Sequence, residues 1–328
     1  MTQNGNFKRR VRARAEKTGE SYTAALSHIR ESALSDPGPP PPRSVRLAVA
    51  QTTPYVDPRS VAELRASGEE MRRLMREAQK ASVRLIHFPE GATCSPNKRI
   101  MSSTGRDPVG PSDWSRFEWT VLREELDATR ELARELGLFA VIGSVHQLTE
   151  PHRPHNSLYI VSDRGELVTR YDERLLSNTK ISFMYTPGST PVTFEVDGVR
   201  FGCSLGMETH FPEIFREYEQ LDVDCVLFST TGATPAFAAE ALGHAASNRY
   251  WVSFSVLAYP GFMPPSGIAA PSGEWVAQCR ADATPSLAIV DVDHNPGEIA
   301  RPWRRMARAG IYEPHMVNDP RSGGRDTF

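Results

Sequence analysis

The 328-residue sequence has few cysteines, no long apolar run and almost no excess of charge of either sign. Its four cysteines are far apart and form no CxxC pair, so a disulfide framework is not expected. No stretch reaches the roughly 18 apolar residues that a membrane span requires. The formal charge of −2 indicates neither a nucleic-acid-binding nor a membrane-surface protein. Because the N-terminus lacks the apolar core of a signal peptide, we expect a reduced, cytoplasmic protein.

Sequence motifs for metals and cofactors are also missing. There is no H-E-x-x-H pattern, no clustered Cys/His motif and no glycine-rich phosphate loop. Glu208 and His210 lie close together in the sequence, but without such a motif they indicate ordinary hydrogen-bonded residues. We therefore expect neither a metal nor a cofactor.

Residues 1–44 differ in composition from the rest of the chain. A basic run over residues 8–17 precedes apolar residues that are spaced over 22–29 as one face of a short helix. Thr18 or Ser21 could cap that helix. A proline run then predicts a stiff, extended linker. The segment is either a solvated basic tail or a docking arm for a protein partner or an acidic surface, and we expect it to be dispensable for folding.

Strand-like and helix-like segments alternate along residues 45–312, which we interpret as one domain followed by a tail at 313–328. Apolar spacing predicts helices at 60–81, 114–136, 211–220 and 236–248, with Gly137 ending the second of them. Strands are predicted at 45–50, 83–88, 138–145, 157–162, 192–196, 199–205, 225–229, 251–257, 275–278 and 287–292. This mixture, with Asp197-Gly198 as a hairpin turn, predicts an α/β sandwich with helices outside and sheets inside.

A glutamate follows one predicted strand directly, in the segment His87-Phe88-Pro89-Glu90. Ligands usually bind at the carboxyl ends of strands in open α/β sheets. A carboxyl group in such a largely apolar setting can have a raised pKa and act as a general base. Glu90 is therefore a candidate catalytic residue, the alternative being an exposed loop carboxylate.

The segment Gly202–Gly206 follows another predicted strand and matches the G-x-S-x-G elbow of serine hydrolases, with Ser204 as the nucleophile. A histidine and an acid should then follow. Asp291 and His294 are available, but they lie three residues apart on one strand-like segment and show no triad signature. A serine hydrolase stays an alternative interpretation of this segment.

Taken in order, these segments resemble the nitrilase superfamily of carbon–nitrogen hydrolases over about four-fifths of the chain. The motifs that carry the resemblance are Val49-Ala50-Gln51, Phe88-Pro89-Glu90, Val141-Ile142-Gly143-Ser144, His155-Asn156-Ser157, Arg170-Tyr171-Asp172-Glu173, Tyr185-Thr186-Pro187-Gly188, Gly202–Glu213, Asn248 and Pro271-Ser272-Gly273. Membership implies a four-layer α-β-β-α sandwich, usually dimeric or larger. It also implies a Glu–Lys–Cys triad in which the cysteine attacks an amide, carbamoyl or nitrile carbon.

This sequence departs from the resembled family at two of the three triad positions. Glu90 is kept, but Gly206 stands at the nucleophile position and Glu173 at the lysine position. Glycine offers no atom for a thioester, and a carboxylate would repel a developing oxyanion. Cys203 lies three residues earlier within the strand and is expected to be a buried core thiol. Lys180 and Arg174 are the candidate replacements for the missing cation.

If Glu90 and Glu173 share a pocket with Glu208 behind them, that pocket is acidic and favours an amine or guanidinium group. Glu208, His210 and Arg174 are then the candidate substrate-binding residues. We expect a protein that binds a small amine- or amide-containing molecule. It is either a catalytically silent homologue or an enzyme with non-covalent acid–base chemistry. An amide hydrolase with an atypical nucleophile is the alternative, so whether the protein is an enzyme stays open.

Overall fold

A computed structural model of the protein describes residues 12–19, 21–26, 43–232, 234–261, 264–294 and 300–323. The chain divides into two units, residues 1–42 and residues 43–328. In the first unit, residues 12–18 and 22–26 are helical. Ser21 caps the second helix, because its Oγ accepts a hydrogen bond from the backbone N–H of Ala24. Residues 8–11 of the basic run, the end of the predicted helix over 22–29 and the proline run lie outside the described residues.

The second unit contains two six-stranded sheets. The first has the order β12-β1-β2-β3-β4-β5 and the second the order β11-β10-β9-β8-β7-β6. The strands of the first sheet are β1 (Ser44–Gln51), β2 (Leu85–His87), β3 (Phe139–His146), β4 (His155–Val161), β5 (Leu167–Asp172) and β12 (Ser286–Asp293). Those of the second are β6 (Thr193–Val196), β7 (Val199–Leu205), β8 (Cys225–Thr230), β9 (Trp251–Val256), β10 (Gly267–Ala269) and β11 (Trp275–Gln278).

Three neighbouring strands run parallel in each sheet: β1, β2 and β3 in the first, and β7, β8 and β9 in the second. Antiparallel strands flank each group of three. Parallel strands end at the same edge of a sheet, so the loops that leave their carboxyl ends gather there. The loops after β2, β7 and β8 carry Glu90, Gly206 and Thr231, and this topology brings them together.

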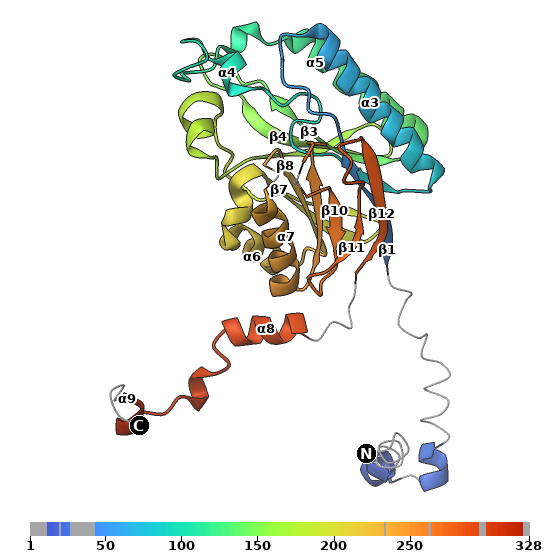
Figure 1. Ribbon diagram of the computed structural model, residues 1–328. Helices are drawn as coiled ribbons and strands as arrows, with labels where there is room; N and C mark the ends of the chain where they lie inside the picture. Colours follow the sequence, from blue (N-terminus) through green and yellow to red (C-terminus); the bar gives the residue numbers. More distant parts are fainter. Residues whose placement is uncertain are drawn as a thin grey trace. The chain divides into compact units, whose positions relative to one another are not determined.

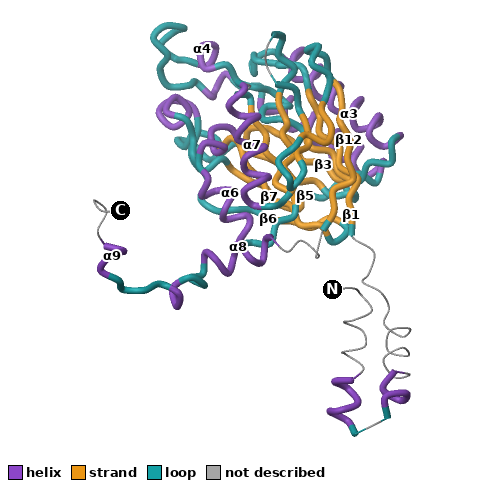
Figure 2. The backbone as a smooth tube through the Cα atoms, turned by 60° about the horizontal axis from the view of Figure 1, so that its bottom comes forward, coloured by secondary structure: helices purple, strands orange, loops and turns teal. Residues whose placement is uncertain are grey.

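Apolar side chains fill the space between the sheets and the space beneath the helices on both outer faces. One cluster lies between the sheets and includes Leu47, Leu158 and Phe201. A second packs the first sheet against helices α3 (Val61–Lys80) and α5 (Trp119–Leu136). A third packs the second sheet against α6 (Pro212–Gln220) and α7 (Pro235–Asn248). Figure 1 shows these two pairs of helices on opposite sides of the sheets, and Figure 2 shows the strands between them. The expected four-layer α-β-β-α sandwich is confirmed.

Local sequence signals account for several ends and turns. Ser60 caps α3 by accepting from the N–H of Glu63, and Gly137 ends α5 with a positive φ of 63°. Asp197 and Gly198 form the predicted hairpin turn with φ angles of 48° and 82°. The helix predicted over 114–136 starts only at Trp119, because residues 114–116 form a separate 3-10 turn.

Several described elements were not predicted from the sequence. They are the strands β5 and β10, the short helices α4 (Lys98–Met101) and α9 (Pro320–Gly323), the helix α8 (Ala300–Arg308), and the 3-10 turns η3 (Gly206–His210) and η4 (Glu313–His315). A π-helical turn, η2 (Lys180–Met184), also appears and contributes to the site below. Within the described ranges, no helix is long and apolar enough to cross a membrane.

Candidate functional site

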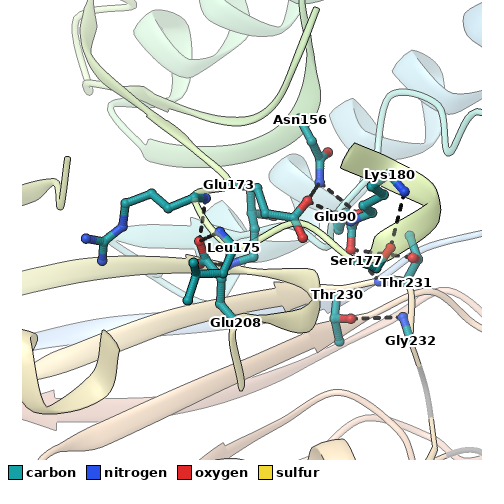
Figure 3. A network of polar contacts seen from close by, with 12 residues as sticks. Glu90, Asn156, Glu173, Leu175, Ser177, Lys180, Glu208, Thr230, Thr231 and Gly232 are labelled. Atoms are coloured by element: carbon teal, nitrogen blue, oxygen red, sulfur yellow. Dashed lines mark hydrogen bonds and ion pairs between the residues drawn. The ribbon is translucent and has the colours of Figure 1, made fainter. Parts of the chain in front are cut away.

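The side chains of Glu90 and Glu173 both accept a hydrogen bond from the side-chain amide of Asn156. Glu90 lies in the loop after β2, and Glu173 follows the last residue of β5. The Nδ2 atom of Asn156, in β4, donates to Glu90 Oε1 at 2.9 Å and to Glu173 Oε2 at 2.6 Å. Both carboxyl groups are buried. The two residues therefore face one site, as Figure 3 shows, and Asn156 fixes their separation. The role of Asn156 was not predicted, although it lies in one of the motifs that carry the family resemblance.

Lys180 supplies a cation to this carboxyl pair. Its Nζ lies 2.5 Å from Glu90 Oε1 and 2.7 Å from Glu173 Oε2. The lysine begins the π-helical turn η2, and such turns are frequent at functional sites. Arg174, the other candidate, instead forms an ion pair with Glu217 at 2.8 Å. The sequence predicted an acidic pocket that would attract an amine. That prediction needs correction, because the ammonium group of Lys180 already contacts both carboxyl groups.

The second oxygen of Glu90 is held by the loop after β8. Glu90 Oε2 accepts from the backbone N–H of Thr231 at 2.9 Å and from its hydroxyl at 3.4 Å. Thr231 was missed by sequence reasoning. The signal that could have found it is its place directly after the middle strand of the second parallel group. Both oxygens of Glu90 are thus fixed by hydrogen bonds.

A side chain at position 206 would require its neighbours to move. Its φ is +55°, a conformation that favours glycine, and a Cβ atom built there would overlap Glu173 Oε1 and lie 2.8 Å from Lys180 Nζ. Glu173 Oε1 is itself buried and has no hydrogen-bond partner among the described residues. The space next to Gly206 is therefore occupied by an unpartnered carboxyl oxygen.

Burial raises the pKa of Glu173 to about 8, against the attraction of Lys180, and the nearby Glu90 and Glu208 raise it further. Burial opposes the charged form of Lys180, but Glu173 and Glu90 outweigh it and hold the pKa of this amine above its ordinary value. Near neutral pH the protonated form of Glu173 therefore predominates, while Lys180 keeps its ammonium charge.

Within the described residues, none of the three candidate substrate-binding residues forms a hydrogen bond or ion pair with Glu90. The buried carboxylate of Glu208 accepts from the backbone N–H groups of Leu205 at 2.8 Å and Arg174 at 2.6 Å. It thereby ties the end of β7 to the loop after Glu173. His210 pairs at 2.8 Å with Glu240. A direct contact of Glu208, His210 or Arg174 with a ligand stays a prediction that these contacts do not favour.

The residues of the serine-hydrolase alternative are also apart. Ser204 is buried, and its hydroxyl donates to Glu208 at 3.2 Å. Asp291 pairs with Arg46 and His294 with Asp224, so neither contacts Ser204.

Cys203, the nearest thiol along the chain, lies fully buried in the cluster between the sheets. In the described part of the chain, no group of His, Cys, Asp and Glu is placed to hold a metal ion.

The comparison with known proteins identifies the family. The sequence model of the family described as Carbon-nitrogen hydrolase matches residues 46–301. The chain belongs to this family. Among solved structures, this carbon–nitrogen hydrolase family member resembles an amidase from Nesterenkonia sp. AN1 of the nitrilase superfamily. One mutant of that amidase is 16% identical with a TM-score of 0.65, covering 85% of this chain and 99% of the other. A second mutant carries the acetamide moiety of fluoroacetamide on its active-site cysteine. It is 16% identical with a TM-score of 0.66, covering 84% and 99%.

Proposed function

We propose that this carbon–nitrogen hydrolase family protein binds a small amide- or amine-containing molecule at the Glu90–Lys180–Glu173 cluster without forming a thioester. The observation that carries the proposal is the occupied space at Gly206. A Cβ atom there would overlap the carboxyl group of Glu173, so a nucleophilic side chain would need a strained φ and a displaced Glu173. The family's triad is degenerate in this chain, with Glu90 kept and the other two positions changed.

The burial of the cysteine side chains supports a function without thiol chemistry. The related amidase carries its acetamide group on an active-site cysteine. In this chain all four cysteines are buried, and Cys203 points into the core between the sheets. A thioester needs an exposed thiolate beside the substrate carbon. No cysteine of this chain meets that requirement.

The hydrogen-bonding groups at the cluster favour an amide over a simple amine. Protonated Glu173 presents a hydroxyl donor beside Gly206, and Lys180 has a third N–H beyond the two that bind carboxyl groups. Both suit a carbonyl oxygen. An amine would have to compete with Lys180 for the same two carboxyl groups, whereas a neutral amide does not.

Non-covalent acid–base chemistry is the second candidate function, favoured by one observation. A carboxyl group with a pKa of about 8 can donate and accept a proton near neutral pH, and Glu173 has this property while it directly contacts Lys180. In this case Glu173 transfers the proton, while Glu90 and Lys180 hold the reacting group.

Calorimetric titration of the purified protein with acetamide, propionamide and propylamine tests the proposal, alongside an assay for released ammonia. We expect saturable binding of an amide that Glu173→Ala weakens and that Glu195→Gln, a change at an exposed strand glutamate, leaves unchanged. Ammonia release that iodoacetamide abolishes, with an acyl group on a cysteine, would refute the proposal. Iodoacetamide-resistant turnover that Glu173→Gln abolishes would favour the acid–base candidate. If the protein binds neither the two amides nor propylamine, the proposed binding function is wrong.

A further inference from the structure

A cavity of about 280 Å³ lies on the outer face of the first sheet, beneath helix α5. Alternate residues of a strand face opposite sides of a sheet. Leu158 of β4 points into the core between the sheets, whereas Val161 packs on the side of α3 and α5. The cavity is therefore separated from the Glu90 site by the sheet itself, and nothing in the proposed function uses it.

One part of the cavity wall is aliphatic. It is formed by Leu126 of α5, Ile142 of β3, Val161 of β4 and Leu167 of β5. Ile142 and Val161 are buried, while Leu167 is 48% exposed at the rim. A wall of this kind binds a hydrocarbon chain, because contact removes apolar surface from water.

The cavity wall also presents a hydroxyl hydrogen without an acceptor, that of Tyr159. Arg170 can only donate, so its contact of 2.8 Å with His146 Nε2 makes that nitrogen an acceptor. The neutral imidazole then carries its proton on Nδ1, which donates to Tyr159 Oη at 2.7 Å. The hydrogen of the Tyr159 hydroxyl is left to donate elsewhere, and no other contact of this hydroxyl is seen among the described residues.

These two hydrogen bonds require a neutral His146. Burial lowers the pKa of His146, and the neighbouring guanidinium of Arg170 lowers it further, while Asp172 opposes the shift. The imidazole is therefore neutral at physiological pH. Its Nε2 accepts from Arg170 and its Nδ1 donates to Tyr159.

The charge of the lining is positive. Arg130 is neutralised by Asp127 at 3.2 Å. Arg123 makes only two bonds of 3.3 Å, to Gln147 and Thr120, and no carboxylate of the described residues lies within ion-pair distance of it. Arg123 and the Tyr159 hydroxyl thus both offer donors to an anion, and an amine would meet like charge.

We propose that this cavity is a binding site for a small monocarboxylic acid with an aliphatic chain. The carboxylate accepts from the Tyr159 hydroxyl and pairs with Arg123, while the chain lies against Leu126 and Leu167. A phosphate would gain nothing from the aliphatic wall, and a hydrocarbon would leave the hydroxyl unpaired. The volume, below the 300–1,000 Å³ that is typical of drug-sized ligands, indicates a small molecule.

Binding of hexanoate to the full-length protein tests the proposal, measured by saturation-transfer NMR and calorimetry, with hexylamine and hexanamide as matched probes. We expect saturable binding of hexanoate and weaker or no binding of the amine. Tyr159→Phe and Arg123→Gln should each weaken hexanoate binding on the order of tenfold. Arg134→Gln, on the same helix but paired with Glu131 and outside the cavity, should leave binding unchanged.

A second set of variants separates this site from the Glu90 cluster. Glu173→Ala should leave hexanoate binding intact, so the two proposals fail independently. Leu126→Asp places a carboxylate against the aliphatic wall and should abolish binding. Circular dichroism and the melting temperature establish that each variant is folded. Equal binding of hexylamine, undiminished binding by both Tyr159→Phe and Arg123→Gln, or no binding of hexanoate at millimolar concentration would each overturn the proposal.

Discussion

Lys180 Nζ lies 2.7 Å from Glu173 Oε2, although Glu173 stands at the position where the family resemblance places a lysine. The cation has therefore not been lost from the site. It enters from seven residues further along the chain, by way of the turn η2, and contacts the glutamate that took the original position. This exchange of places accounts for the burial of two carboxyl groups side by side.

Lys180→Met should destabilise the protein strongly. The change leaves Glu90 and Glu173 buried without their cation, and breaking a buried ion pair on one side costs about 3–5 kcal/mol. Urea unfolding at neutral pH measures the loss. Lys98→Met, at an exposed helix position, is the matched control and should change stability by less than about 0.5 kcal/mol. A small effect of Lys180→Met would mean that the cluster does not depend on this ammonium group.

Glu173 should make the protein less stable as the pH rises from 4.5 to about 8. Its pKa is 4.5 ordinarily and about 8 in the folded protein, so in this window the folded state holds a proton that the unfolded chain releases. One such group lowers the free energy of unfolding by about 1.4 kcal/mol per pH unit. The trend stops above pH 8, where both states are ionised. Urea unfolding of Glu173→Gln across this range should show a flatter pH profile, and equal slopes for the two proteins would argue against the raised pKa.

Gly206→Ala should cost about 1–3 kcal/mol, because the new methyl group meets Glu173 and Lys180 at a positive φ. Gly243→Ala is the matched control. Gly243 lies within α7 with open space around it, so alanine there should stabilise the protein by about 0.5–1 kcal/mol. Denaturant unfolding of both variants measures the contrast. In a Glu173→Ala background the cost of Gly206→Ala should fall, and an unchanged cost would show that Glu173 does not fill this space.

The thiols should react only after unfolding. Cys94, Cys203, Cys225 and Cys279 are all buried, and burial raises the pKa of the Cys279 thiol to about 12. A disulfide reagent such as DTNB should therefore release its chromophore slowly from the native protein and fully in denaturant. Rapid reaction of a single native thiol would reveal a reactive cysteine and reopen the atypical-nucleophile alternative.

Deletion of residues 1–42 should leave the melting temperature of the remaining chain nearly unchanged. The contacts of the chain divide it after Pro42, and β1 starts at Ser44, where it pairs with Asp293. A deletion through Gln51 removes β1 from between β12 and β2, and should abolish folding. Thermal unfolding of both truncated proteins makes the comparison. Loss of soluble protein on the shorter deletion would show that the first unit is needed for folding.

The long elements of the fold could be predicted because their patterns are strong. The helical spacing over 60–81 and the hairpin turn at Asp197-Gly198 both appear as expected. The strand β5 was missed because only Tyr171 packs between the sheets, while Leu167 and Val168 are exposed and Arg170 and Asp172 bind each other on the outer face. The strand β10 has only three residues, too few to show a period.

Part of the candidate site could be predicted from the order of the motifs, and part could not. Glu90 and Glu173 were placed in one site through positions that resemble the family's. The choice between Lys180 and Arg174 was beyond the sequence, since it depends on how residues 174–184 turn back towards β2. Thr231 and Asn156 contribute an amide N–H and a side-chain amide, groups that carry no charge and so leave little signal in composition.

The overlap between a side chain at position 206 and the carboxyl group of Glu173 has a consequence for the history of this protein. A side chain introduced at position 206 by one substitution would meet Glu173 and Lys180, and both would have to shift. A lineage that still had a side chain at 206 could not readily accept Glu173. The residues at the two positions are therefore coupled, and a change at one is easier when the other changes with it. Ancestral sequences that separate the two steps should show the glycine first.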